Sequence, residues 1–513
     1  MALEFRPVDR DQQFLLPPSL REWLPDDHLA WFVVDVVGRL DTLKFRRRPF
    51  GTEARGRQAF DPDMLLCLLI YGYAVGVRSS RQIARLCEVD VAFRLLCAQD
   101  GPSHQTLSRF VAASEKAVVD LFTQVLALCA GLGMVQLGTV AIDGTKIAAS
   151  ASRDRNRDRA SLRKAAAKLV AEHRSTDAAE DEQFGEARGD ELPEGLRSSS
   201  SRAAALQKAF DELDRRVERR EADDSAARER EQERRRQDKT PNPPAGHPGR
   251  CSDDERVSVA ERRLAEARRN AEQTYAKTSA GPQHKKAVPP ERNGRVRRAE
   301  AVLAAAKQAE VQRAADRKAR IARESKSDQV NLTDPDSRLL KTRNGWVQGF
   351  NCQLGVTADQ IIVAASATQQ PADMTCFEPV LQQVMSAVAL LPERPDGQIG
   401  TVLADAGYFS EDNLTCPGPD RLIASGSRRS MAKADPSDQP TTGTEAMQAM
   451  RKRLQTDDDK AVYSARGATV EAVNGQLKDR VGLRQFRRRG LEAAQAELLF
   501  AAAVHNLRKA HRH

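Results

Sequence analysis

The strand pattern of this chain is interrupted by a long stretch, residues 153–330, that has too few apolar residues to build a sheet core. The stretch is rich in Ala, Arg, Glu and Asp and poor in aromatic residues. Two parts of it, 203–236 and 257–276, combine helical propensity with opposite charges at i,i+4 spacing. Their sparse apolar positions form a narrow stripe suited to a helical hairpin or a coiled coil. We expect a hairpin turn near 241–246, a linker over 278–294, and the whole region to be a charged helical insertion in another fold.

Strand patterns stand on both sides of this insertion. Residues 135–150 are rich in β-branched residues, with Asp143-Gly144 as a turn signal, and residues 347–366 read as a β-hairpin. An amphipathic helix over 377–391 and a short apolar strand over 401–404 follow. With the insertion removed, the order of elements is that of an RNase H-like core. We therefore expect an α/β fold, with a mixed sheet flanked by helices.

The N-terminal region, residues 1–130, has a helical pattern. Asp61-Pro62 and Ser103 are helix N-cap signals, and Ser79 or Ser80 caps another short helix. Short helices separated by tight polar turns fit an all-α, helix-turn-helix-like DNA-binding domain, and a plain helical bundle fits about equally well. The most apolar run, 64–77, is too short to span a bilayer.

Charge and cysteine usage narrow the class of protein. The 513-residue chain has a net charge of +9, and residues 451–513 hold 14 Lys or Arg against 7 Asp or Glu. A basic C-terminal segment suits a polyanionic partner. The eight cysteines form no Cys-x-x-Cys pair, and the N-terminus has no signal-peptide pattern. We expect a cytoplasmic protein with reduced thiols that has no membrane partner.

Three carboxylates lie where apolar pattern meets polar sequence: Asp143, Asp405 and Glu471. The first two end strand patterns, and ligand sites of open α/β sheets lie at such strand ends. Three convergent acids repel one another unless cations neutralise them. Oxygen ligands without His or Cys favour Mg²⁺, with Mn²⁺ as a substitute, and two such ions could act on a phosphodiester. Taken singly, each acid is more often a turn or surface residue.

The residues around Glu471 have a geometric relation. Glu471, Asn474 and Lys478 recur at i, i+3 and i+7, so they share one face of a helix. Arg466 is expected in the turn before this helix, where it could offer a planar fork to a phosphate. Tyr463 could add a hydroxyl group or a stacking face. The preceding residues, 427–460, read as a polar loop.

These motifs resemble the DDE transposases of bacterial insertion sequences, in the branch with a Tyr-Arg-Glu-Lys signature, and most closely insertion-sequence family 1182. The resemblance rests on the order of several motifs along the chain. One departure is that four residues separate Arg466 from Glu471, where the common signature has three. The motifs are Leu15-Leu16-Pro17 with Asp27-His28, His104-Gln105-Thr106 with Arg109-Phe110, Asp143-Gly144-Thr145-Lys146, Asp334-Pro335-Asp336-Ser337 with Gly349-Phe350-Asn351, Ala404-Asp405-Ala406-Gly407-Tyr408, and Tyr463, Arg466, Glu471 and Lys478.

The resemblance implies an enzyme that binds the terminal inverted repeats of its element and performs DNA strand cleavage and strand transfer. Asp143, Asp405 and Glu471 would be the catalytic residues, holding two Mg²⁺ ions. It also implies double-stranded DNA as substrate, a homodimer in the synaptic complex, no small-molecule cofactor, and a nucleoid-associated location in a bacterial cytoplasm. The expected DNA-binding residues are Tyr463, Arg466, Asn474, Lys478, Arg81, Arg85, Arg109, Arg487 and Arg488.

The alternatives are an RNase H-like nuclease without transposition, a decayed transposase that acts as a DNA-binding regulator, and a coiled-coil structural protein. The strand patterns on both sides of the insertion disfavour the last. The expected domains are an N-terminal domain (1–130), the first core strands (131–152), the insertion (153–330), the rest of the catalytic core (331–480) and a basic helical tail (481–513).

Overall fold

The structure is a computed structural model, and it describes residues 19–46, 59–168, 194–237, 253–280, 288–326, 328–343, 345–391, 398–426 and 443–513. The chain divides into two compact units, one formed by residues 1–156 with 331–513 and the other by residues 157–330. Three predicted features lie outside the described residues: Leu15-Leu16-Pro17, the turn at 241–246, and residues 427–442 of the expected loop. The five-part division expected above stays a prediction.

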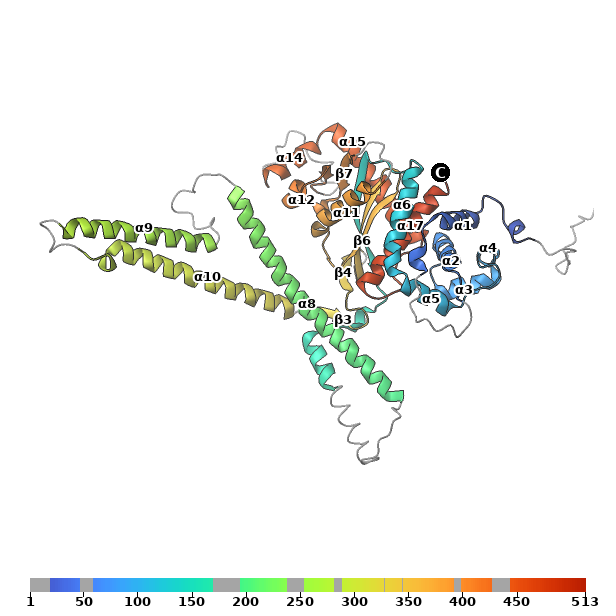
Figure 1. Cartoon of the computed structure of the whole chain (residues 1–513), viewed down its shortest axis with the longest axis horizontal. Coiled ribbons are helices and arrows are strands. Elements are labelled where there is room, and N and C mark those ends of the chain that lie inside the picture. Colours follow the sequence, from blue (N-terminus) through green and yellow to red (C-terminus); the bar gives the residue numbers. More distant parts are fainter. Residues whose placement is uncertain are drawn as a thin grey trace, which may run out of the picture. The chain divides into compact units, whose positions relative to one another are not determined.

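A mixed sheet forms the centre of the first unit (Figure 1). Strand β5 pairs antiparallel with β1, β4 and β6, whereas β1, β7 and β8 run parallel to one another. The predicted mixed α/β fold is therefore confirmed. The strands are β1 (Thr139–Ala148), β4 (Arg338–Thr342), β5 (Gly345–Thr357), β6 (Ile362–Thr368), β7 (Thr401–Ala404) and β8 (Asp420–Ile423).

Helices flank this sheet (Figure 1). Helix α11 (Phe377–Ala389) packs on β5 and β6, and its apolar side chains at Val380, Leu381 and Val384 are fully buried. Helix α17 (Leu491–Ala510) packs on β6 and on α6 (Glu115–Gly131). The sequence analysis expected a basic tail here, but most of α17 is buried. Its apolar composition places it in the core, and its basic residues gather at its C-terminal end.

The N-terminal region of this unit is helical, and two of its three capping signals act as predicted, whereas Ser79 precedes its helix without a side-chain capping hydrogen bond. The Asp61 carboxylate accepts a hydrogen bond from the Asp63 N–H, and the Ser103 hydroxyl accepts one from the Thr106 N–H. The helix-turn-helix assignment stays a prediction. Apart from α6, the helices are α1 (Leu29–Arg39), α2 (Pro62–Ala74), α3 (Ser80–Val89), α4 (Val91–Leu96) and α5 (His104–Ala113).

Two local predictions are wrong. Asp143-Gly144 is not a turn, because β1 continues through it and Gly144 pairs with Gln353 of β5. Part of the expected loop, 443–460, is helical: α14 (Glu445–Arg453) is followed by α15 (Asp457–Arg466). Their polar composition suggested a loop. Instead, the Thr456 side chain caps α15 by accepting a hydrogen bond from the Asp459 N–H, and acidic residues in its first turn favour the helix dipole.

The second unit contains α8 (Glu194–Gln237), α9 (Asp253–Ser279) and α10 (Gly294–Lys326), and the strands β2 (Asn156–Asp158) and β3 (Gln329–Asn331) pair at its ends. Helices are as expected here, but the closely packed pair is α9 with α10, an antiparallel pair seen in Figure 1. Leu264, Ala271 and Val296 form the apolar contact between them. Opposite charges reinforce it, as in the pair Arg268–Glu300 at 2.8 Å. In the described part of the chain, no helix is long and apolar enough to cross a membrane.

Candidate active site

The first two acids lie where the parallel pairing of β1 with β7 stops, Asp143 within β1 and Asp405 directly after β7. In the register of β1 with β7 the last pair is Ile142 with Ala404, so Asp143 and Asp405 come next on each chain segment. Each carboxylate is oriented by a nearby backbone N–H. Gly144 donates to Asp143 Oδ1 at 3.0 Å, and Gly407 donates to Asp405 Oδ1 at 2.9 Å. The sheet therefore sets these two carboxylates side by side.

The third acid, Glu471, ends a π-helical turn, Gly467–Glu471, between α15 and α16 (Ala472–Asp479). Arg466, expected in a turn, is the last residue of α15. Its Nη2 lies 2.7 Å from Glu471 Oε1, and its Nη1 lies 3.6 Å from Asp143 Oδ1. This guanidinium therefore joins two of the three acids.

The extra residue between Arg466 and Glu471 is accommodated by that π-helical turn. In an α-helix, residues five apart are rotated by about 140° from one another. In a π-helix each turn holds one more residue, so residues five apart return to the same side. The departure from the common signature spacing thus leaves the Arg466–Glu471 contact intact.

The acids perturb one another electrostatically. Burial raises the pKa of Asp143 to about 6, Arg466 opposes this rise, and the charges of Asp405 and Glu471 add to it. Burial also raises the pKa of Asp405, and the nearby charges of Asp373 and Glu471 contribute in the same direction. These mutual effects mean that the three predicted acids share one electrostatic environment. Such a cluster is a typical functional site.

The other side chains predicted from this motif surround Asp143 and the end of β7. The Asn474 amide donates to Asp143 Oδ2 at 3.2 Å, and the Lys478 ammonium donates to the Thr145 hydroxyl on β1. Burial lowers the pKa of Lys478. The Tyr463 hydroxyl donates to the Ala404 carbonyl at 3.3 Å. One face of α16 therefore lies against β1 at Asp143 and Thr145, and the end of α15 lies against the last residue of β7.

A fourth carboxylate, Asp373, was missed by the sequence analysis. Its Oδ1 accepts hydrogen bonds from the side-chain amides of Asn351 at 2.8 Å and Gln353 at 2.9 Å. The Tyr408 hydroxyl in turn donates to Gln353. A Cβ on Gly144 would lie 2.6 Å from Asp373 Oδ1, so only glycine fits beside Asp143. The available signal was two polar amides within an otherwise apolar stretch of β5, because buried amides require partners.

The residues present fit a divalent cation in their chemistry, since all the acidic donors are carboxylate oxygens. Asp143 and Asp405 lie together, but the Glu471 side chain is turned towards Arg466. Within the described ranges, no group of three or more His, Cys, Asp or Glu side chains is arranged to hold a metal ion. Glu471 is half-exposed, with a side-chain exposure of 55%.

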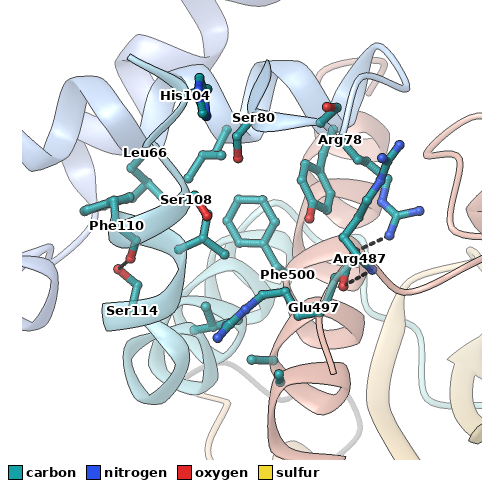
Figure 2. Close-up of a pocket in the computed structure, with 18 of the residues that line it drawn as sticks. Leu66, Arg78, Ser80, His104, Ser108, Phe110, Ser114, Arg487, Glu497 and Phe500 are labelled. Carbon is teal, nitrogen blue, oxygen red and sulfur yellow. Dashed lines mark hydrogen bonds and ion pairs between the residues drawn. The ribbon is translucent and has the colours of Figure 1, made fainter. Parts of the chain in front are cut away.

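The basic residues predicted from the two ends of the chain meet around one cavity of about 380 Å³ (Figure 2). Arg81 of α3 lines it together with Arg487 and Arg488, which precede α17. Arg488 is paired with Glu115, whereas no partner for the side chains of Arg81 and Arg487 is found among the described residues. Two of the predicted residues, Arg85 and Arg109, are exposed and do not line the cavity.

The floor of this cavity is held by a buried ion pair between Arg78 and Glu497, drawn in Figure 2. Arg78 also donates to the Gln485 carbonyl at 3.0 Å. The same segment pairs with the end of β1, where Phe486 donates its N–H to the Ala148 carbonyl at 2.8 Å. The cavity wall is therefore hydrogen-bonded to the strand that carries Asp143.

Two transposase families match this chain. Residues 18–113 match the family described as "Transposase domain (DUF772)", which covers the N-terminal helices. Residues 427–511 match the family described as "Transposase DDE domain", which covers Arg466, Glu471, Lys478, Arg487 and Arg488. No curated protein and no solved structure matches the chain. The two matched families together support a DDE transposase of insertion-sequence type.

Proposed function

We propose that this protein is the transposase of a bacterial insertion sequence, which binds the terminal inverted repeats and performs metal-dependent DNA strand cleavage and strand transfer. The observation that carries the proposal is the meeting of Asp143 and Asp405 where the parallel pairing of β1 with β7 stops, with Glu471 joined to Asp143 through Arg466. The assignment to family 1182 rests on the resemblance of the sequence motifs alone.

The sheet supports an RNase H-like catalytic core. Its antiparallel strands β1, β4, β5 and β6 come first, β4 being an addition to the expected hairpin, and the parallel strands β7 and β8 follow on the other side of β1. This is the expected order of strand, hairpin, helix and strand once the insertion is removed. In such a sheet the carboxyl ends of adjacent parallel strands are the usual place for a ligand.

In this proposal Asp143, Asp405 and Glu471 hold two Mg²⁺ ions, for which Mn²⁺ can substitute. When bound, the ions would activate an attacking oxygen and stabilise the leaving oxygen of a phosphodiester. Asn474 orients the Asp143 carboxylate through its 3.2 Å hydrogen bond. Rotation of Glu471 towards the other acids would free the Arg466 guanidinium to bind a DNA phosphate. Lys478, with its lowered pKa, would contact the backbone beside β1.

The cationic rim of the cavity supports a DNA-binding surface away from the acids. Arg81 and Arg487 are exposed and have no acidic partner among the described residues, which is the state expected of phosphate ligands. Arg488, Arg85, Arg109 and Tyr463 are further candidates of the same kind. Because synapsis brings two DNA ends together, the active complex is proposed to be a homodimer in the bacterial nucleoid.

A strand-transfer assay tests the proposal directly. The purified chain, Mg²⁺, a duplex carrying the element end and a target plasmid are expected to give joined products. Asp143→Asn, Asp405→Asn and Glu471→Gln should each reduce joining by roughly a thousandfold or more, because they remove catalytic ligands. Asp458→Asn, which alters an exposed carboxylate on α15, is the matched control and should join DNA normally.

The two rival functions predict other outcomes in the same assay. Cleavage of any duplex without joined products would favour an RNase H-like nuclease. DNA binding without cleavage would favour a regulator derived from a transposase. Normal joining by all three acid variants would contradict the catalytic assignment itself.

A further inference from the structure

A group of basic side chains lies where the C-terminal ends of α16 and α17 meet. Arg480 follows α16, while Arg508, Lys509 and Arg512 lie at the end of α17. We call these four residues the C-terminal cationic cluster. They line a shallow cleft together with Gln476 and His505. The cluster is distinct from the cavity around Arg487, and none of its members was predicted from the sequence.

The cluster lacks compensating acids. No ion pair to any of its four side chains is found among the residues described. Burial lowers the pKa of both Arg508 and Lys509, and the charges of Arg512 and Arg480 lower it further. Asp359 is the acid that acts on Lys509 in the opposite direction. Like charges are therefore held together at a cost that no ion pair among the described residues offsets.

The neighbouring histidine adds no charge to this surface. Burial lowers the pKa of His505 to about 4, and its Nε2 lies 2.9 Å from the Gln360 carbonyl oxygen. Cations at the C-terminal end of a helix interact favourably with the helix dipole. This interaction is the simplest explanation for Arg508, Lys509 and Arg512. The same explanation covers Arg480 at the end of α16, but it treats each helix separately and does not account for four cations from two helices lining one cleft.

The cluster is connected to the acid centre through Gln360. This residue has φ = +64°, a left-handed conformation that is uncommon for a non-glycine residue. Its Oε1 accepts hydrogen bonds from the Lys509 ammonium at 2.8 Å and the Gln476 amide at 2.9 Å. Its Nε2 donates to the Ala468 carbonyl at 2.8 Å, within the π-helical turn that ends at Glu471.

The four cations reach one cleft from two helices. Arg480 follows α16, Arg508 and Lys509 lie in the last turn of α17, and Arg512 comes two residues after that helix ends. A rigid polyanion that lies in this cleft would therefore meet several cations of the cluster at once.

We propose that the C-terminal cationic cluster binds the phosphate backbone of duplex DNA, where the C-terminal ends of α16 and α17 meet. This inference rests on the proposed function, because it takes the DNA as the substrate of the acid centre. Phosphates neutralise the uncompensated cations, and each neutralised phosphate releases counterions, which makes binding depend on salt. The element end and the target DNA share this backbone chemistry.

Duplex binding measured by fluorescence anisotropy without divalent metal tests the proposal. The full chain is titrated onto an element-end duplex and onto an unrelated duplex between 50 and 300 mM salt. In the double variant Arg508→Gln/Arg512→Gln, the slope of log K against log salt should become shallower by about 2, one for each lost cation. Loss with one duplex alone identifies that DNA as the ligand, and equal loss with both identifies a shared backbone site.

The matched control removes two positive charges elsewhere on the same unit. Lys341→Gln/Arg343→Gln alters exposed residues at the edge strand β4 and its turn, and its salt slope should equal that of the unaltered chain. The thermal midpoint of the cluster variant should be unchanged or higher, because the loss of two positive charges relieves the repulsion within the cluster. An unchanged slope in the cluster variant, or equal changes in both variants, would overturn the inference. If the unaltered chain bound neither duplex, both this inference and the proposed function would be contradicted.

Discussion

At the scale of single residues, the acid centre is a set of like charges held together by one arginine. Arg466 has a side-chain exposure of only 14%, and it contacts both Asp143 and Glu471. Its Nη1 has no hydrogen bond despite being buried, and the same is true of Asn474 Oδ1. Buried polar atoms without partners are costly. The centre is therefore arranged for further charged groups rather than for maximal stability.

The raised pKa of Asp143 predicts a specific pH dependence. The pKa is about 6 in the folded protein against 3.8 ordinarily, so between these values the folded state binds more protons than the unfolded state. The stabilisation is complete below about pH 4 and is lost as the pH rises through 6. In Asp143→Asn without metal, the free energy of unfolding should exceed that of the unaltered chain at pH 7 by up to about 3 kcal/mol.

Urea unfolding in a chelator at pH 4, 5, 6 and 7 measures this difference. The two proteins should have nearly equal stability at pH 4 and should diverge as the pH rises. A constant difference across the series would contradict the assignment of a raised pKa to Asp143.

Asp373 is predicted to position the carboxylates of Asp143 and Asp405. It is held by Asn351 and Gln353, and Gln353 also binds Tyr408, which lies three residues after Asp405. This network joins the backbone beside Asp143 to the turn after Asp405. Asp373→Ala should slow strand transfer by about ten- to a hundredfold, because displaced reacting groups lose rate steeply. Asp373→Asn should be affected less, since its amide oxygen can still accept both hydrogen bonds.

Metal-free duplex binding separates positioning from folding in this experiment. Both Asp373 variants should bind the element-end duplex as the unaltered chain does, with a thermal midpoint that is lowered by a few degrees at most. Equal strand-transfer rates in the unaltered chain and Asp373→Ala would show that the network does not position the acids.

Residue-scale prediction from sequence worked where pattern and chemistry coincided. Asp143 and Asp405 each ended an apolar run, so their approach was predictable, although β1 continues beyond Asp143. Asp373 was not, because a lone acid in a polar loop has no periodicity, and its partners come from β5. The conformation at Gly144 was predicted wrongly for a related reason. The Asp-Gly pair read as a turn, but the glycine is needed for the close approach of Asp373 and Gln353.

At the scale of elements, the π-helical turn Gly467–Glu471 is the feature that keeps the signature residues in register. A single-turn π-helix amounts to one extra residue in an α-helix. We therefore expect that deletion of Ala468 will give a continuous α-helix in which Arg466 and Glu471 are four residues apart. Strand transfer should stay within about tenfold of the unaltered rate, and helicity measured by circular dichroism should not fall.

A deletion in regular helix is the control for this prediction. Deleting Gly475 rotates Lys478 by about 100° relative to Asn474, away from Thr145, and should abolish strand transfer. If deletion of Ala468 were as damaging as deletion of Gly475, the π-helical turn would have a role beyond register.

The reliability of the predicted elements followed the strength of the local signal. Helices with N-caps and strands with continuous apolar runs were located closely, as for α2 and β7. Helices α14 and α15 were read as loop, because their apolar positions are few and Ser, Thr and Asp surround them. Their stability comes from tertiary contacts that have no local signal, such as the ion pair of Arg453 with Asp420 at 2.7 Å. Packing of this kind commonly overrides propensity.

At the scale of the whole molecule, the chain consists of one unit that carries the acids and a charged helical unit inserted into it. All the contacts described for the acid centre, the cavity and the C-terminal cationic cluster are made within residues 1–156 and 331–513. Composition predicted the interruption, since residues 153–330 lack the apolar content of a sheet core. The pairing of α9 with α10 was not predictable, because similar stripes on several helices allow several pairings.

The insertion is predicted to be dispensable for folding of the first unit. The points where the chain leaves and re-enters that unit are adjacent, since Asn331 donates to Asn156 Oδ1 at 2.8 Å and Leu332 donates its N–H to the Arg155 carbonyl at 3.1 Å. A short Gly/Ser linker can therefore replace residues 157–330. Closing a loop with a shorter connection carries a smaller entropic cost.

The shortened chain should unfold in one cooperative transition, with a thermal midpoint within about 5 °C of the acid-bearing unit in the full chain, because the core contacts are unchanged. Its metal-free affinity for the element-end duplex should stay within about tenfold, since the proposed DNA ligands all lie in the retained unit. Calorimetry and anisotropy measure the two quantities. A shortened chain that folds normally but loses duplex binding by more than a hundredfold would assign DNA binding to the helical insertion, and one that fails to fold would show that the two units are not independent.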